Sequence, residues 1–339
     1  MCDKTFCMQI KRLQTPFKGA LVSILAAFLL SACSPGRHQK YDPEEGYSGT
    51  LSISGAFALY PMAVLWAEDF KKENPNVRFN VSAGGAGKGI SDVLSNMVDI
   101  GLVSRELHQV EVERGALPIV VGYDAVISII NRAHPDFDLL QERGLTQAEL
   151  KSIFLEKGIK TWKEIDARLV DRPIEVYTRS DAAGAAETWA KYLGATQEEL
   201  RGIGIFGDPG LAQAVRDNPL AIGFSNVNFV YDLKTRKSSE GVHVLPLDLN
   251  ANGRVEDQEQ FYETLDKLMH AVAEGAYPSP PARELYFVLH RDRPSALLNA
   301  FVRFVLAKEQ QNYLSENGYV PLEKEKIEQQ IHKIDATKH

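Results

Sequence analysis

The chain has 339 residues, of which 44% are hydrophobic and 24% are charged. This is the composition of an ordinary globular protein of about two domains, and it excludes a disordered, collagen-like or coiled-coil chain. The formal net charge of -7 provides no overall positive field for a polyanion, so we expect no nucleic-acid partner. Any anion that the protein binds must be held by local groups.

The first 33 residues have the pattern of an export signal. Four basic residues precede an apolar run at residues 20–30, which is too short to span a bilayer but suits a secretory signal. Small residues and then Cys33 follow the run, as is typical of a bacterial lipoprotein signal whose cysteine is lipidated on sulfur. We therefore expect a signal peptide at residues 1–32 and a polar tether at residues 33–48. A plain signal peptide with an incidental cysteine is the alternative.

Strand and helix patterns alternate through the rest of the chain. In chain order we predict a strand at 51–54, a helix at 61–72, a strand at 77–81, a helix at 90–97, a strand at 119–131, a helix at 146–154, a strand at 174–178, a helix at 183–193, strands at 221–225 and 242–245, a helix at 261–273, a strand at 285–290 and helices at 294–306 and 310–317. This order indicates an α/β protein with open, mostly parallel sheets and a ligand at the strands' C-terminal ends.

Three of the strand-to-helix junctions share a run of small residues. They lie at residues 54–61, 84–89 and 179–185. Small residues let backbone N-H groups approach a ligand, and each helix N-terminus adds about half a positive charge. One such junction often only closes a turn, but three together predict a cradle for an anion.

An ordered set of motifs resembles the PstS-type phosphate-binding proteins over nearly all of the mature chain. The motifs lie at residues 55–61, 84–90, 99–105, 121–131, 145–154, 161–162, 179–189, 221–224, 277–278 and 283–286. The resemblance implies a type II periplasmic binding protein fold, in which two α/β lobes are joined by a two-strand hinge with a ligand cleft between them. It places lobe 1 at residues 49–130 and 226–339, and lobe 2 at residues 131–225.

The resemblance also implies a set of ligand-binding residues. Ser104 matches a serine that donates its hydroxyl, Asp124 an aspartate that accepts a proton from phosphate, and Arg179 an arginine that contacts the anion. The remaining positions of the implied cleft are Ala56, Phe57, Ala86 and Gly184.

Several hydroxyl groups that the family places in this cleft are absent. Ala56, Phe57 and Ala86 stand in the first two loops, and Ala183 and Ala185 replace a serine and a threonine after Arg179. Hydrogen bonds to a charged ligand are worth roughly 1.5 to 3 kcal/mol each, so three losses weaken binding by roughly three decades or more. The alanines also enlarge the cleft, which favours a bulkier anion as an alternative to phosphate.

These features predict a protein that binds a solute and is not an enzyme. The expected partners are phosphate or a related oxyanion, an ABC permease in the inner membrane, and a lipid bilayer that holds Cys33 on the periplasmic side. We expect a monomer. The alternative is a sensor or interaction lipoprotein that keeps the fold but does not serve transport.

Residues 248–259 have the pattern of a twelve-residue calcium loop. The predicted ligands of Ca²⁺ are Asp248, Asn250, Asn252, Arg254 through its carbonyl, Glu256 and Glu259. The alternative is an Asn-Gly turn with a solvated acidic face.

A glycine pattern at residues 202–207 also matches a dinucleotide-binding motif. It follows a predicted helical stretch at residues 197–201, whereas the motif requires a preceding strand. We therefore interpret this pattern as a chance match.

Overall fold

The computed structural model describes residues 40–156 and 158–336. The predicted signal peptide and Cys33 lie outside the described residues, so the structure does not test them. Among the described residues, no helix combines the length and the apolar character needed to cross a bilayer.

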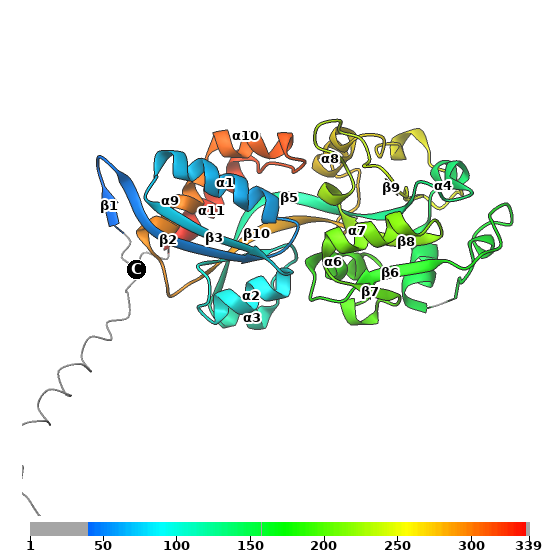
Figure 1. Ribbon diagram of the computed structural model, residues 1–339, viewed down its shortest axis with the longest axis horizontal. Helices are drawn as coiled ribbons and strands as arrows, with labels where there is room; N and C mark the ends of the chain where they lie inside the picture. Colours follow the sequence, from blue (N-terminus) through cyan, green and yellow to red (C-terminus); the bar gives the residue numbers. More distant parts are fainter. Residues whose placement is uncertain (1–39, 157, 337–339) are drawn as a thin grey trace, which may run out of the picture. The chain divides into compact units, whose positions relative to one another are not determined.

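Strand β5 (Ala116–Asn131) is a long central strand (Figure 1), and its side chains belong to two hydrophobic cores. Its N-terminal part pairs antiparallel with β10 (Ala282–His290), and its C-terminal part pairs antiparallel with β8 (Ala221–Asn226) and β9 (Val242–Val244). Side chains up to Val121 belong to one core, and those from Ala125 onward belong to the other. The long apolar run of this strand therefore connects two lobes.

The first lobe is built around β2 (Gly46–Gly55), which pairs in parallel with β3 (Val77–Ala83) and β4 (Ile100–Val103). Strand β10 lies antiparallel between β4 and β5, and β1 (Lys40–Asp42) pairs with the start of β2. The helices of this lobe are α1 (Tyr60–Glu73), α2 (Ala86–Leu94), α3 (Gln109–Glu113), α9 (Ala296–Val305), α10 (Lys308–Glu316) and α11 (Lys324–Ala336).

The second lobe is built around β6 (Glu175–Arg179), which pairs in parallel with β8 and β7 (Ile203–Ile205). Its α-helices are α4 (Phe137–Arg143), α5 (Gln147–Lys151), α6 (Gly184–Tyr192), α7 (Gly207–Asp217) and α8 (Leu265–Ala273). The short helical turns are Ser152–Glu156, which is π-helical, and the 3-10 turns Trp162–Glu164, Gln197–Glu199, Val227–Phe229 and Asp257–Glu259.

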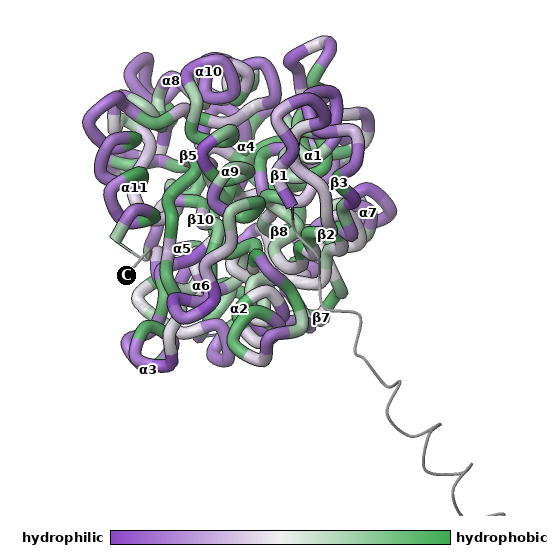
Figure 2. Tube along the Cα trace, turned by 90° about the vertical axis from the view of Figure 1, so that its left-hand side faces the viewer, coloured by the Kyte–Doolittle hydropathy of each residue, from purple (hydrophilic) through white to green (hydrophobic). Residues whose placement is uncertain are grey.

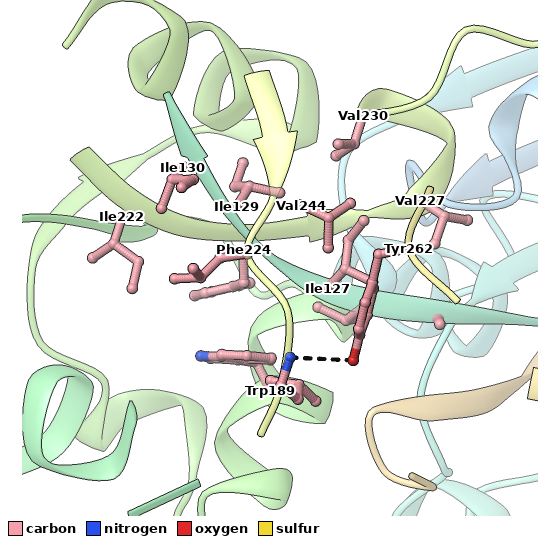
Figure 3. Packing of buried hydrophobic residues seen from close by; sticks show 14 of the residues in the cluster. Ile127, Ile129, Ile130, Trp189, Ile222, Phe224, Val227, Val230, Val244 and Tyr262 are labelled. Atoms are coloured by element: carbon pink, nitrogen blue, oxygen red, sulfur yellow. Dashed lines mark hydrogen bonds between the residues drawn. The ribbon is translucent and has the colours of Figure 1, made fainter. Parts of the chain in front are cut away.

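Aromatic and β-branched side chains fill the core of the second lobe (Figure 3). Trp189 of α6 stacks on Phe224 of β8, with ring centroids 5.8 Å apart. The Tyr262 hydroxyl accepts a hydrogen bond of 3.2 Å from the Leu247 N-H, so this buried oxygen is satisfied. The packing fixes the position of α6, whose first residues reach the candidate site described below.

The hydropathy of the chain follows this architecture (Figure 2). Apolar residues run along β5 and β10 through the interior, whereas outer elements such as α10 are hydrophilic. This distribution is what burial of the strands between layers of helices requires.

The predicted α/β class is confirmed, and each predicted strand and helix matches an observed element to within a few residues. The expectation of mostly parallel sheets is wrong, because β5 and β10 run antiparallel to their neighbours and make the sheet mixed. The prediction missed strands β1, β4 and β7 and helices α3, α4, α7 and α11, of which β7 and α7 follow one another at residues 203–217. The predicted boundaries differ from this division, because residues 227–273, predicted in lobe 1, pack in the core of the second lobe, and residues 40–48, predicted in the tether, contain β1 and the start of β2.

Candidate functional site

A narrow pocket with about 150 Å³ of unfilled space lies at the C-terminal ends of the strands. Its lining comes from both lobes and consists of Ala56, Phe57, Ala58, Gly85, Ala86, Ser104, Arg179, Ala183, Gly184, Ala185, Asp208 and Asn226. These residues end or follow the six strands β2, β3, β4, β6, β7 and β8. A ligand position beyond the carboxyl ends of strands is the one expected for an α/β sheet.

Two glycines make the close approach of these segments possible. Gly55 ends β2 with φ at +137°, and a Cβ there would lie 2.2 Å from the Leu102 carbonyl oxygen. A Cβ on Gly184 would lie 2.3 Å from the Ser104 Oγ. Larger side chains at these two positions would force the loops apart, so the absence of a side chain brings the start of α6 against Ser104.

Four helices start at the pocket without a side-chain cap. The N-cap residues of α1, α2, α6 and α7 are Leu59, Gly85, Ala183 and Phe206, and none makes a side-chain capping hydrogen bond. Of the helices that begin elsewhere, α5, α8 and α9 are capped by Ser or Thr hydroxyls, whereas α4 and α10 also have no side-chain cap. The first N-H groups of α2 and α6 are left for other acceptors, whereas those of α1 and α7, on Tyr60 and Gly207, donate to the Ala56 carbonyl and to Asp181.

The pocket contains several donors that the protein does not use itself. Within residues 40–156 and 158–336, no acceptor is found for the N-H groups of Phe57, Ala86, Gly184 and Ala185. The Ser104 hydroxyl, on a residue only 2% exposed, is likewise without a partner in this part of the chain. Buried donors normally have acceptors, so the lining is suited to an acceptor-rich ligand such as an oxyanion.

Arg179, the last residue of β6, supplies the formal positive charge of the lining. Its Nε and Nη2 donate to the two oxygens of Asp181 at 2.8 and 2.6 Å, and its Nη1 donates to Asp208 Oδ2 at 2.6 Å. Burial alone lowers the pKa of Arg179, but the Asp208 and Asp181 carboxylates outweigh burial and hold that pKa above its ordinary value. The guanidinium stays charged, and two carboxylates share it.

Asp124 does not belong to the pocket lining. It lies opposite Arg283 in the β5–β10 pair and accepts from the Arg283 Nε at 2.7 Å and from its Nη2 at 3.0 Å. The same guanidinium also donates to the Asn226 Oδ1, so Asp124 is connected to the pocket through one intermediate residue. The predicted contact between Asp124 and a ligand stays a prediction.

A second group of ion pairs links the two lobes beside the pocket. Arg105, which follows Ser104, donates to the Glu111 carboxylate at 2.7 and 2.9 Å and lies 2.9 Å from Glu187 on α6. Nearby, Lys191 of α6 lies 2.7 Å from Glu106. These contacts hold α6 next to the segment that carries Ser104.

The structure thus brings together six of the seven residues predicted for the cleft: Ser104, Arg179, Ala56, Phe57, Ala86 and Gly184. Sequence reasoning missed Asp208 and Asn226. Asp208 lies in the first turn of α7, directly after the glycine pattern that was interpreted as a chance match. That pattern was a signal of a further strand-to-helix junction.

Two aromatic rings limit the size of the pocket. The Phe57 ring lies 5.8 Å from that of Phe206, and the Arg179 guanidinium carbon lies 5.5 Å from the Phe57 centroid.

The carboxylates of the predicted calcium loop have partners inside the loop. Asp248 accepts from the N-H groups of Asn252 and Gly253, and Glu259 accepts from those of Leu249, Asn250 and Glu256. The Arg254 side chain pairs with Glu256. Among the described residues, no group of three or more His, Cys, Asp or Glu side chains is arranged to hold a metal ion. The calcium hypothesis stays a prediction.

Comparison with known proteins gives a family match and full-length relatives. The description of the matching family is PBP superfamily domain, and it covers residues 42–309. The chain is 28% identical to the phosphate-binding protein PstS of Bacillus subtilis strain 168, over 91% of this chain and 96% of the relative. It is 24% identical to PstS of Pseudomonas aeruginosa PAO1, over 96% of this chain and 99% of the relative. The resemblance to PstS-type proteins is confirmed.

Solved structures give the same fold. A putative phosphate ABC transporter substrate-binding protein with bound phosphate from Clostridium perfringens superposes with a TM-score of 0.67, at 23% identity, covering 81% of this chain and all of that one. An ABC-type phosphate transport receptor from Vibrio cholerae gives 0.59 at 19% identity, covering 80% and 100%. At these identities the likeness establishes the fold alone, and it confirms the predicted type II periplasmic binding protein fold.

The buried pair of Asp124 and Arg283 provides a test of stability. Arg283→Met leaves the Asp124 carboxylate buried without its partner, and we expect a loss of about 3–5 kcal/mol in the free energy of unfolding, measured by urea denaturation. Lys72→Met, which breaks an exposed pair with Asp69, is the control and leaves the urea midpoint unchanged. Equal midpoints for both variants would show that the buried pair is not a structural requirement.

The calcium hypothesis is tested by thermal melting of metal-free protein. A metal that binds only the folded state stabilises it by about 2.7 kcal/mol at a hundredfold excess over the dissociation constant, so calcium should raise the melting temperature and EGTA reverse the effect. Glu259→Gln removes the bidentate ligand and should abolish the difference, whereas Glu263→Gln outside the loop should not. Identical melting curves with calcium and EGTA in the unmodified protein would contradict the calcium hypothesis. The alternative, an Asn-Gly turn with a solvated acidic face, would then stand.

Proposed function

The chain belongs to the PBP superfamily, and from this premise we propose that it is the solute-binding protein of an ABC importer. Its ligand is phosphate or a related oxyanion, held in the pocket at the strand ends as a cleft between the two lobes. The support is a set of donors: the unused N-H groups of Phe57 before α1 and at the starts of α2 and α6, the Ser104 hydroxyl and the shared Arg179. An oxyanion is the ligand class that accepts from all of them at once.

Backbone N-H groups can act as donors to the anion in place of the hydroxyl groups that this chain lacks. The alanines at positions 56, 86, 183 and 185 remove side-chain donors but leave the main-chain N-H groups at the helix starts. Helix N-termini favour a negative charge, and this stabilisation does not depend on the side chains. We therefore propose that the backbone carries much of the binding in this chain.

The partners of the proposed function are a membrane permease and a lipid bilayer. The Bacillus subtilis relative is named a phosphate-binding protein, and the solved structures from Clostridium perfringens and Vibrio cholerae are described as a putative phosphate ABC transporter substrate-binding protein and an ABC-type phosphate transport receptor. In the proposal the protein acts as a monomer on the periplasmic side, anchored through Cys33, and delivers the anion to the permease without chemical change.

A specific observation favours one second candidate. Two carboxylates already share Arg179, which reduces the positive charge available to an entering anion. A lipoprotein that keeps the fold as a sensor, or as an interaction protein, tolerates weak anion binding. Phosphate uptake by cells that lack the protein separates the two candidates. The uptake rate falls if the protein is a transport component and stays the same if it is a sensor or an interaction protein.

The binding proposal predicts the effect of a single hydroxyl group. Ser104→Ala removes a hydrogen bond to a charged ligand worth roughly 1.5–3 kcal/mol, so phosphate binding measured by calorimetry should weaken about ten- to a hundred-fold. Ser225→Ala is the matched control, because that buried hydroxyl has no partner within the described chain and does not line the pocket. Equal affinity in the two variants would place the anion elsewhere.

The anchoring proposal predicts covalent lipid on Cys33. Cells supplied with radiolabelled palmitate should label the protein, and Cys33→Ser should remove the label while Cys7→Ser, within the predicted signal, should retain it. A labelled Cys33→Ser protein would contradict lipidation at this position.

A further inference from the structure

A phenylalanine ring of the first lobe packs against two residues of the second lobe beside the pocket. Phe57 lies in the turn between β2 and α1, which both belong to the first lobe. Its ring lies edge to face with that of Phe206, with centroids 5.8 Å apart and an interplanar angle of 84°, and its centroid lies 5.5 Å from the Arg179 guanidinium carbon. In the second lobe, Arg179 ends β6 and Phe206 follows β7. The Phe57 side chain therefore connects the two lobes.

A glycine leaves room for this ring. Gly207 is the first residue of α7 and has φ at +72°, and a Cβ there would lie 3.0 Å from the Phe57 Cζ. A larger residue would press on the ring and would be strained at this φ. The Gly207 N-H donates to Asp181 at 3.2 Å, and Asp181 also accepts from Arg179. These hydrogen bonds fix the part of the second lobe against which the Phe57 ring packs.

The two rings lie outside the cores of both lobes. Among the described residues, the two hydrophobic cores include neither Phe57 nor Phe206. Phe206 is 62% exposed and lies outside the pocket lining, although a large aromatic side chain gains most from burial. Its ring contact is with a residue of the other lobe. This contact therefore depends on how close the lobes are to each other.

Phe57 also carries one of the unused donors of the pocket. It belongs to the lining, and its N-H has no acceptor within the described chain. An oxyanion that accepts from this N-H fixes the main chain of Phe57, and the ring of the same residue is then held against Phe206. Anion binding and the contact between the lobes are thus linked through a single residue.

We propose that the contact between the Phe57 and Phe206 rings holds the lobes together over a bound oxyanion and thereby determines how slowly the anion leaves. The inference rests on the proposed function and deepens it. The pocket lining comes from both lobes, so a bound anion is released when the lobes separate. Separation breaks the aromatic contact, whereas entry of the anion precedes its formation. The contact therefore slows dissociation and leaves association unchanged.

The test measures the release of radiolabelled inorganic phosphate. The full-length protein, purified in detergent, is loaded with the label and chased with excess unlabelled phosphate. Phe206→Ala should release the label roughly three- to tenfold faster, as expected for the loss of one aromatic pair, with an unchanged association rate constant. Phe206→Tyr keeps an aromatic ring and should release the label at the unmodified rate. Ile203→Ala is the control, because it removes another exposed apolar side chain, on β7, and should change neither rate constant.

A double-mutant cycle identifies the partner ring. Phe57→Leu keeps the main-chain N-H and an apolar side chain but removes the ring, so it should also speed release. If the two rings act through their contact, Phe206→Ala adds nothing to the release rate of Phe57→Leu. If instead the two effects multiply, the rings act separately and the proposal is overturned.

The outcomes separate the inference from the proposed function. Phosphate binding with unchanged release from Phe206→Ala overturns the inference and leaves the proposed function standing. Slower association with unchanged release, or equal acceleration in Ile203→Ala, overturns it as well. No binding of phosphate by the unmodified protein overturns the proposed function and the inference together. If Phe57→Leu does not fold, the variants of the exposed Phe206 still decide.

Discussion

Arg179 lies at the end of β6, and its buried charge is balanced by Asp181 and Asp208 rather than by water. A buried guanidinium without carboxylates would be strongly destabilising, so the two aspartates are a condition for placing the residue there. The Arg179 guanidinium lies over the ring of Phe57. Its hydrogen bond to Asp208 connects the end of β6 to the first turn of α7. The remaining lining of the pocket is neutral. The lining therefore contains one cation, which two carboxylates share.

The backbone donors of the lining result from the topology of the fold. Strands of both lobes end at the same place, and the helices that follow them start there without side-chain caps. This supplies backbone donors from several directions, independent of which side chains the loops carry. The missing hydroxyl groups consequently remove only part of the donor set. The ion pair of Arg105 with Glu187 and the exposed pair of Lys191 with Glu106 connect α6 to the segment that carries Ser104.

The alternation of strands and helices could be predicted from the sequence pattern, and runs of small residues mark three strand-to-helix junctions. The cleft residues were implied by the resemblance to PstS-type proteins, and six of the seven line the pocket. Asp208 was not predicted, since the glycine pattern before it was judged only as a dinucleotide motif and α7 was not recognised. The position of Asp124 depends on the strand register that places Arg283 opposite it, and no local pattern shows that partner. The antiparallel course of β5 and β10 is likewise a tertiary property. In residues 248–259 the same carboxylates suit either a calcium ion or the N-H groups of their own loop.

The central claim is that an oxyanion binds among the donors at the strand ends, beside Arg179. A crystal structure of the protein grown with saturating phosphate tests this most directly. The account predicts the anion within hydrogen-bond distance of the Ser104 hydroxyl, the Arg179 guanidinium and the N-H groups of Gly184 and Ala185. Phosphate bound at another surface, with these donors still unused at saturation, would contradict it.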